Sequence, residues 1–195
     1  MPKISEARRQ ARRAEIMAAA LRCFARNGYR GTSMADIIAE SQLSAGAIYS
    51  YFASKKELIR SVAGSVLEGR EHELDSAGED HVLEPAEIAI TLIRGLRAHA
   101  PISALLQVWS EASVDSELRV VLNDVIGRVR TTICQQLEIW AHTQQTIDDP
   151  AAWAQHVTPT LLALVPGYVM QTTLTDNFDD DDFLRALPEL LRGSA

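Results

Sequence analysis

The sequence has little cysteine, which limits what can hold the fold together. Its 195 residues include only Cys23 and Cys134, which lie far apart and belong to no C-x-x-C pair. A disulfide framework and a thiolate metal site are therefore both poorly supported, and the two side chains are expected to pack as small core hydrophobes in a reducing compartment. A chain of this length buries enough apolar surface to fold without such links.

Long apolar runs and the usual catalytic motifs are also missing. No apolar stretch reaches bilayer-spanning length, and no signal-peptide core follows the basic N-terminus. The five histidines form no H-E-x-x-H motif or Cys/His cluster, and there is neither a nucleophile elbow nor a glycine-rich phosphate loop. We therefore expect a soluble cytoplasmic protein with no membrane partner, catalytic residue, metal or cofactor. A helical enzyme is the less favoured alternative.

Charge is unevenly distributed along the chain. Residues 1–60 contain 11 Lys and Arg against 5 Asp and Glu, a net charge of +6, which leaves 8 against 21, a net charge of −13, for residues 61–195. A compact basic segment is typical of proteins that bind nucleic acid. DNA would repel the acidic remainder, which is expected to face elsewhere and to have a different role.

Apolar residues recur at helical spacing along the first third of the chain. This part predicts a long helix, two short helices separated by a tight turn, and a connecting helix from Lys55 to about Leu74. Asn27 and Gly28 predict a left-handed stop for the long helix. The next three helices are expected to begin after capping serines, with Asp36 completing the first cap as a capping box. These serines are Ser33, Ser44 and Ser54.

The rest of the chain also predicts helices only, so the expected fold class is all-α. Polar turn residues from Asp75 predict a loop, followed by helices at about 86–99, 101–113, 117–144 and 151–175, and a last helix whose start is stabilised by the acidic run 179–182. Pro159 and Pro166 lie inside an apolar helical run and predict a kink that opens a pocket or shapes an interface.

The short segment that begins at Ser44 carries the clearest functional pattern. Helical spacing directs Ile48 and Phe52 inward, which leaves small residues on the opposite face with a tyrosine on each flank. The DNA major groove accepts such a helix, and Ser, Tyr, Lys and backbone N–H groups are common phosphate donors. Core and rim aromatics of a helical bundle are the alternative. We interpret residues at about 33–52 as a helix-turn-helix.

A longer stretch carries a family resemblance. "FARNGYRGTSMADIIAESQLSAGAIYSYFASKKELI", within about residues 10–65, resembles the DNA-binding domain of TetR-type transcriptional regulators. The resemblance implies an N-terminal helix-turn-helix domain at 8–68, joined by a connecting helix to a C-terminal helical bundle at 75–195 for ligand binding and dimerisation. The candidate DNA contacts, from the residue pattern and the matching family positions, are Thr32, Ser33, Ser44, Ala45, Gly46, Ala47, Tyr49, Tyr51 and Lys55.

Two positions depart from the family pattern. Gln42 stands where glycine is frequent in the turn, which predicts a slightly different turn. Ala45 stands where lysine is frequent, which removes a possible base or phosphate contact. The segment therefore predicts how the protein docks on DNA better than which operator sequence it selects.

The resemblance also implies roles for the acidic two-thirds. It implies a homodimer through the helices at about 117–144 and 151–175, whose remaining apolar residues Ile126, Leu162 and Val169 could face the partner. It also implies a repressor that binds a palindromic operator in double-stranded DNA. A small hydrophobic effector is expected to release the repressor from this operator. A DNA-binding regulator or architectural protein without an effector is the alternative. The candidate pocket residues are Gln107, Trp109, Trp140, His142, Trp153, His156, Tyr168 and Met170.

Overall fold

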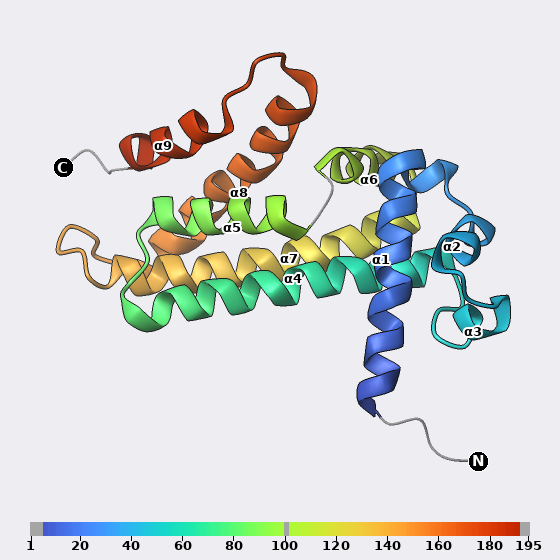
Figure 1. Cartoon of the computed structure of the whole chain (residues 1–195). Coiled ribbons are helices and arrows are strands. Elements are labelled where there is room, and N and C mark those ends of the chain that lie inside the picture. Colours follow the sequence, from blue (N-terminus) through green and yellow to red (C-terminus); the bar gives the residue numbers. More distant parts are fainter. Residues whose placement is uncertain (1–5, 100–101, 192–195) are drawn as a thin grey trace. The chain divides into compact units, whose positions relative to one another are not determined.

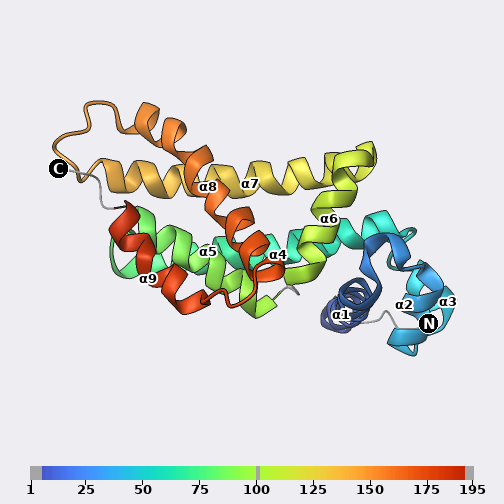
Figure 2. The ribbon, with the colours of Figure 1, turned by 90° about the horizontal axis from the view of Figure 1, so that it is seen from above.

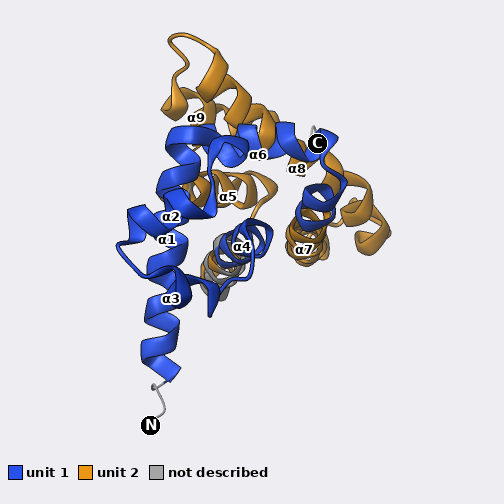
Figure 3. Ribbon diagram, turned by 90° about the vertical axis from the view of Figure 1, so that its right-hand side faces the viewer, with its two compact units in different colours: residues 1–65, 103–122 blue, residues 66–102, 123–195 orange. Residues whose placement is uncertain are grey.

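The computed structural model describes residues 6–99 and 102–191, apart from the side chains of residues 66–68, 70–73, 75, 79–80 and 99. The described residues form nine helices and no strand (Figure 1), which confirms the all-α prediction. They divide into two compact units, coloured separately in Figure 3. Unit 1 comprises residues 1–65 and 103–122, and unit 2 comprises residues 66–102 and 123–195.

Unit 1 contains the predicted helix-turn-helix. Its helices are α1 (Glu6–Gly31), α2 (Met34–Ser41), α3 (Ala45–Tyr49), the start of α4 (Lys55–Asp80), α6 (Ile102–Val114) and the start of α7 (Ser116–Ala141). Buried side chains of α1 to α4 share one core with Ala112 and Leu118. Residues 103–122 pack in unit 1 and not with the predicted C-terminal domain, a difference that helical periodicity cannot predict because it does not reveal which helix packs on which.

The end of α1 differs from the predicted stop. Gly28 has φ 72° and ψ 168°, a conformation open almost only to glycine, and the helix kinks there and continues to Gly31. The turn beyond the kink buries Tyr29 against Phe24, with ring centroids 5.6 Å apart. The Thr32 hydroxyl donates to the carbonyl oxygen of Gly28 at 2.7 Å and thereby satisfies an acceptor at the kink.

The predicted helix starts are confirmed by their hydrogen bonds. Ser33 and Asp36 form a reciprocal capping box, and the side chains of Ser44 and Ser54 accept from backbone N–H groups three residues further on. Asp179 does the same at the start of α9, where its carboxylate accepts from the backbone N–H of Asp182 at 2.8 Å. Local sequence rules were sufficient here because each cap joins residues of one turn.

The predicted end of α4 near Leu74 is wrong, since the helix runs to Asp80. Gly78 lies in this extension, and a single glycine costs a helix only about 1 kcal/mol. The site of a Cβ on Gly78 lies 3.4 Å from Oε1 of Gln136 on α7, so the extension packs on a neighbouring helix. Tertiary packing therefore outweighs the turn-like local composition.

Unit 2 contains the rest of α4 and α7 together with α5 (Pro85–His99), α8 (Pro150–Leu174) and α9 (Asp180–Leu191). Helix α5 packs against both α8 and α9, and Figure 2 shows α9 running alongside it. Helix α8 is continuous through Pro159 and Pro166, so neither proline breaks it. Its buried residues recur along one face, and that packing stabilises the helix despite the backbone donors that prolines lack.

Candidate nucleic-acid interface

Helix α3 exposes the face that the sequence predicted. Ile48 and Phe52 are fully buried, whereas Ser44, Ala45 and Gly46 are exposed. Gly46 borders open space, because no atom lies within 4 Å of the position that a Cβ would take. Small exposed residues let a helix approach another surface closely, which is what the major groove requires of a recognition helix.

The two tyrosines that flank this face differ in exposure. Tyr49 is 51% exposed, and its side chain extends from the end of α3. Tyr51 is half-buried and packs against the unit 1 core. Periodicity alone treats the two as equivalent flanks, because it does not account for the turn that follows α3. Tyr49 is therefore the better-placed contact of the two.

The turn between α2 and α3 adopts a left-handed conformation at its first residue. Gln42 has φ 58° and ψ 21°, and its backbone N–H donates to the Ala39 carbonyl oxygen at 3.4 Å. Glutamine takes here a left-handed conformation that glycine adopts without strain. This turn fixes the direction in which α3 leaves α2.

Thr32 and Ser33 face in different directions. Thr32 is 2% exposed, and its hydroxyl donates inward to the carbonyl oxygens of Cys23 and Gly28. Ser33 is exposed, and hydrogen bonds from its hydroxyl and backbone N–H lower the pKa of the Asp36 carboxyl group. In this conformation Thr32 has no exposed hydroxyl, so a phosphate contact at this position would use the backbone.

Lys55 is held by the end of α1. Its Nζ donates to the carbonyl oxygens of Tyr29 at 2.7 Å and Thr32 at 2.8 Å, and it lies 4.3 Å from the centre of the Tyr29 ring. Burial lowers the pKa of the ammonium group, and the negative charge of Glu111 opposes that shift. Two of its three N–H donors are used, and the third is available to an acceptor such as phosphate. Sequence reasoning missed these contacts, which span more than twenty residues.

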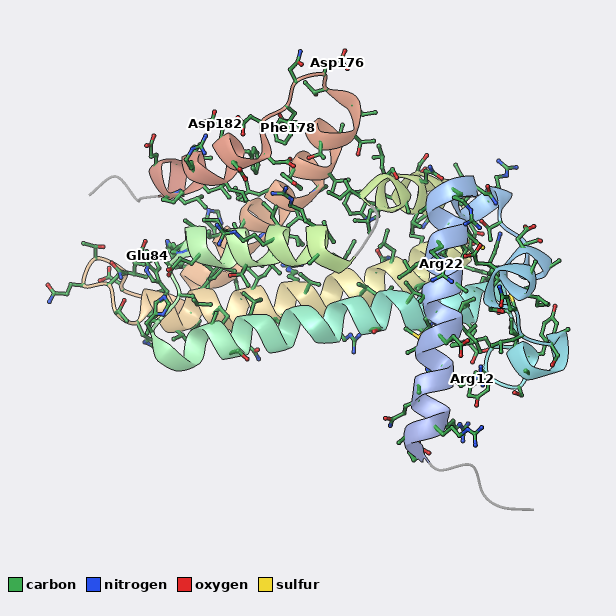
Figure 4. The ribbon with its side chains drawn as sticks, viewed as in Figure 1. Arg12, Arg22, Glu84, Asp176, Phe178 and Asp182 are labelled. Atoms are coloured by element: carbon green, nitrogen blue, oxygen red, sulfur yellow. The ribbon has the colours of Figure 1, made fainter. Side chains whose placement is uncertain are left out.

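Two arginines of α1 bind a glutamate of α2. Glu40 accepts hydrogen bonds from Arg22 at 2.6 Å and from Arg26 at 2.5 Å, and these bonds lower the pKa of its carboxyl group. Figure 4 labels Arg22 on the side of α1 that faces α2. These charge-assisted hydrogen bonds tie α1 to α2 within unit 1.

The eight candidate pocket residues are divided between the two units. Gln107 and Trp109 belong to unit 1, where the side chain of Gln107 lies against Gly28. Trp140 and Trp153 pair in unit 2, with ring centroids 5.3 Å apart. The other four, which also lie in unit 2, are His142, His156, Tyr168 and Met170.

Tyr168 lies at the centre of an aromatic cluster in unit 2 that the sequence did not reveal. Its ring contacts Phe178 and Phe183, at centroid distances of 5.9 and 5.5 Å, and Figure 4 labels Phe178 in the loop between α8 and α9. The side chain is fully buried, its hydroxyl has no hydrogen-bond partner among the described residues, and burial raises its pKa. His142, His156 and Met170 are exposed instead.

Comparison with known proteins identifies the same part of the chain. Residues 16–62 match the family model described as bacterial regulatory proteins, tetR family. The HTH-type transcriptional regulator YfiR of Bacillus subtilis is 36% identical over 78 residues, which cover 40% of this chain and 38% of YfiR. Three further curated regulators are matched over only 50–55% of their own lengths.

Solved structures share the fold over most of the chain. Salmonella enterica GusR has a TM-score of 0.74 and 21% identity, with 98% of both chains covered. Bacillus subtilis FadR, solved in complex with stearoyl-CoA, has a TM-score of 0.75 and 16% identity, with 93% of this chain and 98% of FadR covered. At such identities the likeness shows the fold alone.

The helix order and the exposed face of α3 define an all-helical protein of the helix-turn-helix class. The family match over residues 16–62 falls on α1 to α4, where the motif was recognised in the sequence. In these residues the chain is similar to the DNA-binding segment of bacterial regulatory proteins of the tetR family. Within the described residues, no helix combines the length and apolar character needed to cross a bilayer, and no cluster of three potential metal ligands occurs.

Proposed function

We propose that the protein is a cytoplasmic, homodimeric repressor that binds a palindromic DNA operator through α3 and leaves it when a small hydrophobic effector binds. The observation that carries the proposal is the exposed small-residue face of α3, with Tyr49 beside it and open space above Gly46. A helix with this shape enters the major groove, and neighbouring Ser44 and Lys55 supply phosphate donors, whereas both donors of Ser33 are taken by Asp36.

A dimer supports this mode of binding, because two-fold related recognition helices read half-sites about 34 Å apart, in successive major grooves. We assign the interface to α7 and α8, as the sequence suggested. Val169 is not part of it, since it is fully buried within its own chain. The exposed apolar side chains of α8 are Met170 and Leu174, at 50% and 66% exposure, and these are better placed for a partner.

An effector site belongs to unit 2 in this proposal. Its large aromatic side chains, the Trp140–Trp153 pair and the cluster around Tyr168, offer apolar contacts of the kind that bind hydrophobic ligands. FadR, which shares the fold, is solved with an acyl-CoA, and this supports a hydrophobic effector. Such an effector must bind better to the conformation that is unsuited to DNA, because equal affinity for both shifts nothing.

The proposal is tested by selecting tight-binding duplexes from a random-sequence DNA library and measuring affinity by fluorescence anisotropy. Tyr49→Phe removes an exposed hydroxyl and is expected to weaken binding about three- to tenfold, the value of one hydrogen bond. Tyr168→Phe is the matched control, since it removes a buried hydroxyl in unit 2 and should leave DNA affinity unchanged. Enrichment of no palindromic sequence, or equal effects of both variants, would contradict the assigned surface.

The effector is tested separately, by a thermal-shift screen of fatty acids and acyl-CoA esters followed by the anisotropy assay. A ligand of the proposed kind raises the melting temperature and releases the selected duplex. If no acyl compound does both, the effector part of the proposal is overturned while DNA binding stands.

A further inference from the structure

One lysine beside the candidate DNA surface is already paired with a carboxylate of its own chain. Lys56 is the second residue of α4, directly after Lys55, and its Nζ donates to Oε2 of Glu117 on α7. Both side chains belong to unit 1 and are substantially exposed, at 43% for Lys56 and 71% for Glu117. The pair joins positions 61 residues apart in the sequence. Neither residue is among the DNA contacts predicted from the sequence.

Two neighbouring residues hold Glu117 in the position from which it binds Lys56. Oδ1 of Asp115 accepts from the backbone N–H groups of Glu117 at 2.9 Å and Leu118 at 3.0 Å, so Asp115 caps the start of α7. Leu118, the next residue, is buried in the unit 1 core with residues of α1 to α4. A capped helix start with a buried anchor therefore holds the carboxylate near the first turn of α4.

Other carboxylates strengthen the negative potential at this corner. Asp115 adds to the field around Lys56, whose pKa is raised chiefly by its bond to Glu117. Glu111 on α6 opposes the fall in the pKa of Lys55. The two lysines at the start of α4 thus belong to the same compact unit as Glu111 of α6, Glu117 of α7 and Asp115 between these helices.

We propose that Lys56 is a phosphate-binding residue and that Glu117 competes with DNA for it, so that the α6–α7 corner holds down the affinity of the free protein for DNA. This inference rests on the proposed DNA-binding function. An exposed ion pair is weak, and lysine carries its charge on a flexible stem, so the dense phosphates of a duplex displace the carboxylate. DNA binding must break the pair, and the competition appears as lost affinity.

The test is a double-mutant cycle on the selected duplex at several salt concentrations. Glu117→Gln keeps the shape of the side chain but removes its charge, and it should tighten binding about two- to fivefold, as expected for an exposed pair. Lys56→Met should weaken binding and make the slope of log affinity against log salt shallower by about 0.9, the effect of one phosphate contact. Glu117→Gln should then have no further effect in the Lys56→Met background.

Glu189→Gln is the control, because it removes the same charge from an exposed position on α9 and should not change affinity. If Glu117→Gln tightens binding equally with and without Lys56, the effect is general electrostatics and the competition is refuted. An unchanged salt slope for Lys56→Met overturns the phosphate contact. Both outcomes leave the proposed function intact, because that is tested separately, by selection of a duplex with the wild-type protein and by the Tyr49→Phe variant.

Discussion

A Cβ atom on Gly28 would lie 2.0 Å from Oε1 of Gln107, so the side chain of α6 fills the space that the glycine leaves at the kink of α1. The contact joins two elements of unit 1. It accounts for the position of Gln107, which the sequence suggested as a pocket residue. A residue with a Cβ at position 28 would therefore meet two obstacles, the positive φ and the Gln107 side chain.

Gly28→Ala separates these two requirements. The glutamine is flexible at its far end and can move aside, but the backbone at φ 72° and ψ 168° strains any residue with a Cβ. We expect a loss of about 1–3 kcal/mol in the free energy of unfolding, measured by urea titration. Adding Gln107→Ala should restore only a minor part of it. Full rescue by the second change would show that steric overlap, rather than backbone strain, causes the loss.

The left-handed turn at Gln42 predicts a stabilising change. A residue with a Cβ is destabilised by about 1–2 kcal/mol in this conformation. Glycine loses more conformational entropy on folding, so Gln42→Gly should raise the free energy of unfolding by about 0.5–1 kcal/mol. The measurement is the urea midpoint of the variant, with Gln42→Ala as the control that keeps the Cβ. A glycine variant no more stable than the alanine variant would mean that Gln42 makes compensating contacts.

The features that could be predicted from the sequence are those whose interacting groups lie close together along the chain. The caps at Ser33 and Ser44 and the inward face of Ile48 and Phe52 follow from hydrogen bonds and periodicity within a few residues. These features carry the helix-turn-helix assignment. They could be predicted because the apolar pattern of a short helix follows directly from the order of its residues.

The features that the sequence did not predict depend on tertiary contacts. Lys55 binds carbonyl oxygens 26 and 23 residues away, and Thr32 turns its hydroxyl inward to satisfy the kink. Ala112 of α6 joins the core of unit 1 through packing that no local pattern encodes. The pairing of Lys56 with Glu117 is of the same kind. The sequence shows which residues are polar, but only the fold determines the hydrogen-bond or ion-pair partner of each one.

The Arg22–Glu40–Arg26 brace predicts a pH dependence. Its hydrogen bonds lower the pKa of Glu40 below the ordinary value of 4.5. The brace is therefore fully stabilising above that value, and its contribution is lost as the pH falls through the lowered pKa. The difference in melting temperature between the wild type and Glu40→Gln should be largest near pH 7 and shrink below about pH 4.

Salt provides the check on the origin of that difference. Because both arginines are exposed, 1 M NaCl should reduce the gap between wild type and Glu40→Gln at pH 7. A gap that is independent of both pH and salt would point to lost packing of the Glu40 side chain rather than to its charge.

Gly46→Ala separates docking on DNA from folding. A methyl group at this position meets no atom within 4 Å, so the variant should fold with unchanged or slightly higher stability. On DNA the same methyl group would enter the small-residue face that approaches the groove, and overpacking there costs about 1–3 kcal/mol, or roughly five- to hundredfold in affinity. Gly69→Ala on α4 is the matched control, since no described atom beyond its own helix backbone lies within 4 Å of its Cβ position and it lies outside the helix-turn-helix. Equal DNA affinities for Gly46→Ala and the wild type would place the groove-facing surface elsewhere on unit 1.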